Sequence, residues 1–196
     1  THSVFSQTAV VRHKNSIKSI VFRGFRNNGG EKNTITTTPL IGTNNFNWNT
    51  VEGFNYRYGI SYRKKINDDQ RLTSKLLMRY GLSNRQFNAK FSTNYFFGKT
   101  NKSQLSLSGG RYVFQYNNEA PVNELINTAY TLFYGSNYLK IYQAWFGNLK
   151  YQYRHISGFT LTNQLKYQSR NPLYNSNLFS FRKNNITFTE NYPVEK

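Results

Sequence analysis

The dominant feature of the sequence is a regular alternation between apolar and polar side chains. From position 54 to position 63, every even-numbered residue is aromatic or aliphatic, and every odd-numbered residue is polar or glycine. A helix would place such residues on mixed faces, whereas a β-strand turns consecutive side chains to opposite faces. The segment therefore predicts a strand that has one apolar face and one polar face.

Similar alternation recurs along most of the chain. It is clear over residues 71–80, 86–97, 148–154 and 159–168, and weaker over residues 4–12, 16–26, 104–117 and 179–190. Turn sequences rich in Asn, Asp and Gly separate these segments, which favours antiparallel hairpins over parallel crossovers. In residues 104–117 the alternation changes parity after Gly109-Gly110, which predicts a β-bulge there. The whole pattern predicts about eight to ten strands.

One segment follows a helical period instead. Between positions 122 and 133 the apolar residues recur at intervals of three and four, which is typical of an amphipathic helix. Pro121 suits a first helical turn, and Gly135 suits a C-terminal stop. We predict a short helix near residues 121–134, lying at a barrel mouth, inside the lumen or on the rim, with its apolar side chains packed.

Composition narrows the class of protein. The chain carries 26 Lys and Arg against 8 Asp and Glu, a net charge of +18, yet it has 16 Tyr, 16 Phe and 2 Trp. The longest apolar run is three residues, too short for a transmembrane helix. Three classes remain: a basic nucleic-acid binder, a soluble β-rich domain of adhesin type, and an outer-membrane β-barrel. Only in the barrel is a low mean hydropathy compatible with a surface that contacts lipid, because every second residue faces lipid and the others are polar.

The charges and the rings fall on opposite parities. The basic residues of the polar parity are predicted to face a lumen or the membrane rim: Arg57, Arg63, Arg71, Lys75, Arg79, Lys90, Lys150, Arg154 and Lys166. The residues of the apolar parity are predicted to face lipid: Phe54, Tyr56, Tyr58, Ile60, Tyr62, Phe87, Phe91, Tyr95, Tyr151, Tyr153, Phe159 and Tyr167. A sheet that stacks nucleobases interleaves rings and charges on one face. The separation therefore favours the barrel.

Catalytic chemistry finds little support in the sequence. His2, His13 and His155 lack the spacing of metal ligands, and Asp68-Asp69 occupies a predicted hairpin turn. There is no cysteine, and no phosphate-binding, dinucleotide-binding or nucleophile motif. We therefore predict no enzyme activity, no cofactor and no metal site.

Several short motifs resemble a Gram-negative outer-membrane β-barrel family of unknown function, in which a carboxypeptidase-regulatory-like β-sandwich usually precedes the barrel region. The resemblance covers about residues 45–178. The motifs that carry it are Asn49-Thr-Val-Glu-Gly-Phe54, Arg79-Tyr-Gly-Leu-Ser-Asn84, Gly109-Gly-Arg-Tyr-Val-Phe-Gln-Tyr-Asn117, Pro121–Phe133, Asn137-Tyr-Leu-Lys-Ile-Tyr142 and Tyr167–Asn175. The resemblance implies an outer-membrane location, contact with outer-membrane lipid and no known catalytic residues.

The predicted fold is all-β: an antiparallel outer-membrane-type β-barrel, or part of a larger one. We expect residues 1–196 to be a single barrel region from a longer chain, because it begins at Thr1, shows no sandwich domain and ends without an aromatic residue. The expected role is structural, transport or envelope assembly, with a cationic lumen, other envelope proteins as partners and no nucleic acid. The alternative is a soluble basic-aromatic sheet that binds nucleic acid or acidic glycans.

Overall fold

The computed structural model describes residues 16–30, 32–99, 102–117, 119–182 and 186–191. In chain order its strands are β1 (Arg26–Asn28), β2 (Asn33–Thr37), β3 (Phe46–Asn49), β4 (Gly53–Asn67), β5 (Gln70–Gly81), β6 (Gln86–Phe97), β7 (Ser103–Gln115), β8 (Ile141–Arg154) and β9 (Thr160–Pro172). Its helices are α1 (Ile17–Arg23) and α2 (Glu124–Ala129), and α2 continues as a π-helical turn, η2 (Tyr130–Tyr134).

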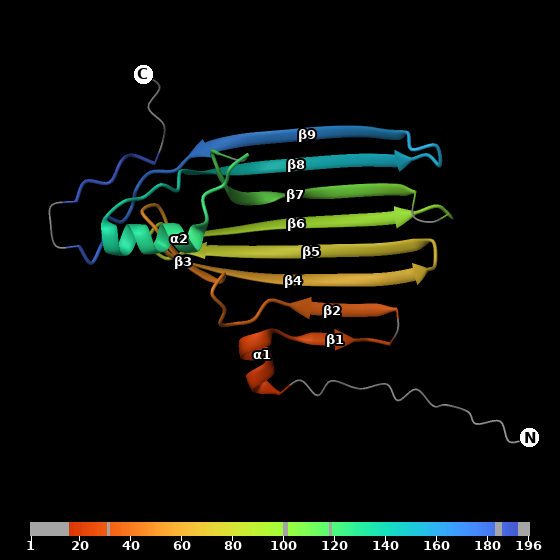
Figure 1. The fold of residues 1–196 in the computed structure, drawn as a ribbon, viewed down its shortest axis with the longest axis horizontal. Coiled ribbons are helices and arrows are strands. Elements are labelled where there is room, and N and C mark those ends of the chain that lie inside the picture. The colour runs from red at the N-terminus through yellow and green to blue at the C-terminus, as the bar shows by residue number, and fades with distance from the viewer. Residues whose placement is uncertain (1–15, 31, 100–101, 118, 183–185, 192–196) are drawn as a thin grey trace, which may run out of the picture.

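The nine strands form one antiparallel sheet. Their spatial order is β1-β2-β4-β5-β6-β7-β8-β9, and β3 pairs with the first residues of β4 (Figure 1). From β4 to β9 each strand pairs with the next one along the chain, so this part of the sheet is a meander. The predicted antiparallel, mostly β architecture is confirmed, and the nine described strands lie within the predicted number.

Strand register separates polar and apolar residues across the meander. One row of paired residues crosses all six strands and is wholly polar: Ser61, Lys75, Ser92, Ser108, Asn148 and Lys166. The adjacent row lies on the opposite face and contains only apolar residues, glycine and one tyrosine: Ile60, Leu76, Phe91, Gly109, Gly147 and Tyr167. Because side chains alternate along every strand, the two parities become two faces of one sheet.

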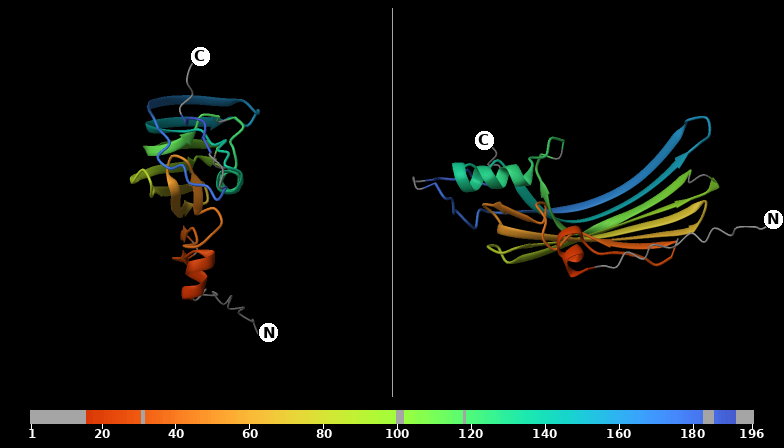
Figure 2. Two further views of the ribbon diagram at one scale, coloured as in Figure 1. Left: turned by 90° about the vertical axis from the view of Figure 1, so that its left-hand side faces the viewer. Right: turned by 60° about the horizontal axis from the view of Figure 1, so that its bottom comes forward.

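The sheet is curved but open, so the described residues do not close into a barrel by themselves, and the alternative, that the chain is part of a larger barrel, stays a prediction. Among the described residues, β1 pairs only with β2, and β9 pairs only with β8. Figure 2 shows the sheet as a trough, with α2 lying on its concave side. The physical reason is the number of long strands: β4 to β9 are six, whereas the smallest outer-membrane barrels need about eight.

Three weaker predictions from the alternation were also wrong, and a fourth lies outside the described residues. Residues 16–26, predicted as a strand, contain helix α1, because Ile17, Ile20 and Val21 fit a helical spacing equally well. The described part of residues 179–190 contains no strand. The glycine pair at 109–110 causes no shift of register in β7. The predicted strand over residues 4–12 lies outside the described residues.

The predicted helix is present, and both of its ends follow from local chemistry. The side chain of Asn123 accepts hydrogen bonds from the backbone N–H groups of Leu125 and Ile126, at 3.0 and 3.1 Å. This Asn is an N-cap, one of the residue types that satisfy the first free amides of a helix. Gly135 adopts the left-handed conformation that ends the helical segment, with φ of 68°.

The packing of the helix is the reverse of the prediction. Its fully buried side chains are polar, Asn127 and Thr131, each 0% exposed. Leu125, Ile126 and Phe133, in contrast, are 46%, 55% and 61% exposed. The reason is that α2 covers the polar face of the sheet, so its polar side finds partners there. Ile126 and Phe133 stay exposed, and Leu125 contributes to the lining of a pocket between helix and sheet.

A small apolar core lies at the same end of the sheet as α2. Val51, Val113, Leu139, Ile141 and Leu173 are each at most 7% exposed and pack together, with Val122 against them. The helices among the described residues are too short and too polar to cross a lipid bilayer.

We expect a Gly110→Ala substitution in β7 to lower the free energy of unfolding by about 1–3 kcal/mol. Gly110 has φ of 135°, and a Cβ there would overlap the carbonyl oxygen of Ala89 on the neighbouring strand. Gly147→Ala in β8 is the matched control, because no atom lies within 4 Å of its added Cβ. Chemical denaturation measures both. Equal stability of the two variants would contradict the strain at Gly110.

Candidate functional site

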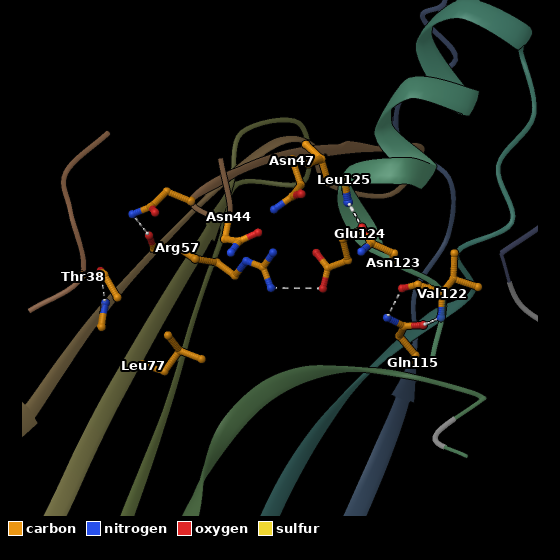
Figure 3. Close-up of a pocket in the computed structure, with 12 residues that line it drawn as sticks. Thr38, Asn44, Asn47, Arg57, Leu77, Gln115, Val122, Asn123, Glu124 and Leu125 are labelled. Carbon is orange, nitrogen blue, oxygen red and sulfur yellow. Dashed lines mark hydrogen bonds and ion pairs between the residues drawn. The ribbon is translucent and has the colours of Figure 1, made fainter. Parts of the chain in front are cut away.

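A pocket of about 410 Å3 lies where α2 meets the polar face of the sheet (Figure 3). Its walls come from the segment between β2 and β4, from β4 and β5, from the end of β7, and from the residues that begin α2. Leu77, Val122 and Leu125 supply apolar surface. The rest of the lining is mainly amide and charged side chains, so the pocket combines a polar wall with small apolar patches.

Two acids and two arginines form a buried charged chain beside this pocket. Arg79 donates from Nε to Oε1 of Glu52 at 2.8 Å and from Nη2 to Oε2 of the same carboxylate. Oε1 of Glu124 accepts from Nη1 of Arg57 at 3.1 Å and from Nη1 of Arg79 at 3.3 Å. The side chains of Arg79 and Glu52 are 3% and 0% exposed. Each buried charge therefore has an opposite charge at hydrogen-bond distance.

The turn between β3 and β4 holds the carboxylate of Glu52 in place. The side-chain oxygen of Asn49 accepts from the backbone N–H groups of Val51 and Glu52, at 2.9 and 2.8 Å. The amide nitrogen of Asn49 donates to Oε2 of Glu52 at 2.8 Å. Such side-chain-to-backbone bonding is what Asn contributes to turns. The Asn49–Glu52 motif is thus a local structure that delivers a carboxylate to Arg79.

Further amides make the walls of the pocket rigid. Nδ2 of Asn45 donates to the carbonyls of Pro39 and Arg57, at 2.7 and 3.0 Å. The side chain of Gln115 clamps the backbone of Val122, accepting from its N–H at 2.8 Å and donating to its carbonyl at 2.9 Å. These contacts fix the wall segments before any ligand binds.

Three polar atoms around the pocket have no hydrogen-bond partner within the part of the chain that the structure describes. They are Nδ2 of Asn47, Nε of Arg57 and Oε2 of Glu124. Asn47 is 3% exposed, and Figure 3 shows its amide directed into the pocket toward the Arg57–Glu124 pair. A buried polar atom without a partner is costly, so these atoms require a ligand or water.

Helix α2 is attached to the sheet by a second buried polar network. The oxygen of Asn127 accepts from the N–H groups of Tyr138 and Leu139, and its nitrogen donates to Oδ1 of Asn137 at 2.8 Å. Asn137 in turn donates to Oγ1 of Thr50 at 2.7 Å. The helix is therefore held from the turn between β3 and β4 and from the segment before β8, through polar contacts that only a fixed position satisfies.

The nine basic residues predicted to line a lumen all lie on one face of the sheet, as the register places them. The structure brings only Arg57 and Arg79 into the charged cluster. Nζ of Lys90 lies 4.3 Å from the ring centre of Tyr112, and the guanidinium of Arg71 lies 4.5 Å from that of Phe96. The others are spread along the strands: Arg63, Lys75, Lys150, Arg154 and Lys166.

Eleven of the twelve residues predicted to face lipid lie on the opposite face of the same strands. Large side chains there are open to the surroundings, with Phe87 57% and Tyr167 69% exposed. Phe159 is the exception. It lies in the turn before β9, where its carbonyl accepts from the N–H of His155, so strand parity does not apply to it.

Sequence reasoning missed the two acids of the cluster and Asn47. A signal existed for Glu52, because it is one of only 8 acidic residues and directly precedes a strongly basic strand. Glu124 and Asn47 carried no comparable signal. Among the described residues, no group of three or more His, Asp or Glu lies close enough to hold a metal ion.

We expect Glu52→Gln to lower the free energy of unfolding by about 3–5 kcal/mol, because it leaves the guanidinium of Arg79 buried without its principal counter-charge. Denaturant titration measures the change. Asp68→Asn is the control: Asp68 pairs with Lys65 at 2.6 Å, but its side chain is 95% exposed, and we expect no measurable change. A Glu52→Gln variant as stable as the parent would contradict the structural role of the ion pair.

Comparison with known proteins places the chain in a family. The model of the C-terminal domain of a family of unknown function (DUF5686) matches residues 18–196. No curated protein and no solved structure matches the chain. The matched range includes all nine strands, the Asn49–Glu52 turn and helix α2. The chain therefore belongs to the family of unknown function DUF5686, as its C-terminal domain.

Proposed function

We propose that this chain forms part of the wall of an outer-membrane β-barrel and acts as a transport or envelope-assembly component. The polar, concave face lines an aqueous interior, and α2 lies within that interior. The apolar, convex face contacts outer-membrane lipid. The role is physical, and it assigns no residue a catalytic task.

The separation of the two faces carries this proposal. Across six neighbouring strands, one face presents polar rows and the other presents exposed Phe, Tyr, Leu and Ile side chains. In water, so large an apolar surface would be an aggregation hazard, whereas lipid accepts it. The six strands contain 12 to 15 residues each, and about 9–11 residues suffice for a tilted strand to cross a bilayer.

The edge of the sheet at β9 supports the same proposal. All 13 residues of β9 are exposed. A long unprotected edge strand readily pairs with further strands. In the proposed barrel, β9 pairs with a strand supplied from another part of the same polypeptide or from a partner, and closure then satisfies the backbone groups that lipid cannot.

The charges on the polar face determine which solutes such a barrel would attract. Of the nine basic residues predicted for this face, seven lie outside the charged cluster. Five of these have no ion pair with an acidic side chain among the described residues and are spread along β4, β5, β8 and β9: Arg63, Lys75, Lys150, Arg154 and Lys166. An enclosed surface of one sign concentrates counter-ions. The proposed interior therefore attracts anionic solutes or acidic segments of envelope partners.

A cysteine scan of β6 tests which face meets lipid. The chain contains no cysteine, so each labelled thiol reports on one position. With the full chain in lipid vesicles, we expect a lipid-attached quencher to reach dyes at Phe87, Ala89, Phe91, Thr93 and Tyr95. We expect an aqueous quencher to reach dyes at Lys90, Ser92 and Asn94. Aqueous quenching at every position, in a protein monodisperse without detergent, would overturn the proposal.

A pair of neighbouring charge substitutions provides an energetic test. Phe91 lies near the middle of β6 on the apolar face, and Ser92 lies beside it on the polar face. We expect Phe91→Arg to destabilise the membrane-folded state by about 2–4 kcal/mol and Ser92→Arg to have a much smaller effect. Unfolding from vesicles measures both. Equal effects, together with steeply salt-dependent DNA or RNA binding, would instead favour a soluble nucleic-acid-binding sheet.

A further inference from the structure

We infer that the pocket beneath α2 is a binding site for a neutral saccharide unit. The three unpartnered polar atoms around it are the first observation: two donors, Nδ2 of Asn47 and Nε of Arg57, and one acceptor, Oε2 of Glu124. The three residues that carry these atoms line one cavity, and the amide of Asn47 is aimed into it (Figure 3). This inference concerns the chemistry of the cavity and does not depend on where the sheet resides.

The mixture of donors and acceptor selects the ligand class. A phosphate or carboxylate would accept from Asn47 and Arg57 but would bring a negative charge beside the carboxylate of Glu124. A metal or ammonium ion would satisfy Glu124 but meet the guanidinium of Arg57. A hydroxyl group both donates and accepts a hydrogen bond. Adjacent hydroxyls of one sugar ring therefore satisfy all three atoms without introducing a charge.

The geometry of the charged cluster explains why these atoms stay available. Oε1 of Glu124 is shared between Nη1 of Arg57 and Nη1 of Arg79. Because this one oxygen receives both arginines, Oε2 of Glu124 and Nε of Arg57 are left over. Glu52 holds Arg79 from the other side, so the pair cannot easily rotate into a two-bond arrangement. The cluster thus leaves one donor and one acceptor without a partner in the wall of the same pocket.

The remaining lining suits a sugar ring. Leu77, Val122 and Leu125 offer apolar surface to the C–H groups of a pyranose. The volume of about 410 Å3 falls within the range of roughly 300–1,000 Å3 that is usual for small-molecule sites. The walls are already fixed by the amides of Asn45 and Gln115. A preformed cavity reduces the entropy lost when a ligand binds.

Saturation-transfer NMR and calorimetry on the full chain test the inference. The probes are glucose, galactose, mannose and maltose, with inorganic phosphate and an acetylated dipeptide amide as competing classes. Any detergent must be an amine oxide, because glucoside and maltoside headgroups are themselves saccharides. We expect at least one saccharide to bind, and neither phosphate nor the dipeptide amide to displace it.

Two substitutions of Asn47 test whether the saccharide binds in this pocket. Asn47→Ala removes the buried donor, and Asn47→Asp keeps the shape but replaces the donor by an acceptor. We expect each to weaken saccharide binding by about tenfold or more. Asn148→Ala, on the same face but outside the pocket, is the matched control and keeps full affinity.

Thermal melts of each variant report folding separately from binding. A folded Asn47→Asp variant that keeps the affinity of the parent would overturn the inference. So would the absence of binding by every saccharide, which would mean that water alone satisfies the pocket. Preferential binding of phosphate or of the dipeptide amide would also overturn it. None of these measurements reports membrane insertion. A negative result for saccharide binding is therefore distinguishable from a negative result for the proposed barrel.

Discussion

The buried ion pair between Glu52 and Arg79 is the interaction on which one end of this molecule depends. Two hydrogen bonds join the carboxylate to the guanidinium, and a third comes from Asn49. Burying such charges is unfavourable unless each finds a partner in fixed geometry. The pair therefore demands that the β3–β4 turn and strand β5 meet in one arrangement. That arrangement positions Arg79 to reach Glu124, and so it also sets where α2 begins.

Where α2 meets the sheet, polar side chains are buried and apolar side chains are exposed, which is the reverse of the usual arrangement in proteins. The contacts that hold α2 are amides, hydroxyls and carboxylates, while Ile126 and Phe133 lie exposed on the outer side of the helix. Polar contacts are directional, so they specify one position of the helix where apolar packing would allow several. Specificity here comes at the expense of apolar burial, which is confined to a small cluster around Ile141.

The alternation of side chains predicted the long strands β4 to β9 and their two faces, because both depend on local periodicity. Pairing then keeps each parity on one face, so Ser61 and Lys166, five strands apart, belong to the same polar row. Closure could not be predicted in this way, since it depends on the number and tilt of strands. The helical spacing after Pro121 likewise identified a helix but not the side it buries. The pocket depends on Asn47 and Glu124, which become neighbours only through tertiary structure.

The contacts of α2 also imply an order of assembly. Its partners Trp48, Arg57 and Arg79 all precede it in the chain, with separations of 80, 67 and 45 residues. Strands β8 and β9 follow it. A chain that emerges from its N-terminus can therefore dock the helix on β4 and β5 before its last hairpin exists. Asn127 of the docked helix accepts from the N–H groups of Tyr138 and Leu139, so it fixes the segment that leads into β8. The β8–β9 hairpin then adds to a sheet whose polar face α2 already covers.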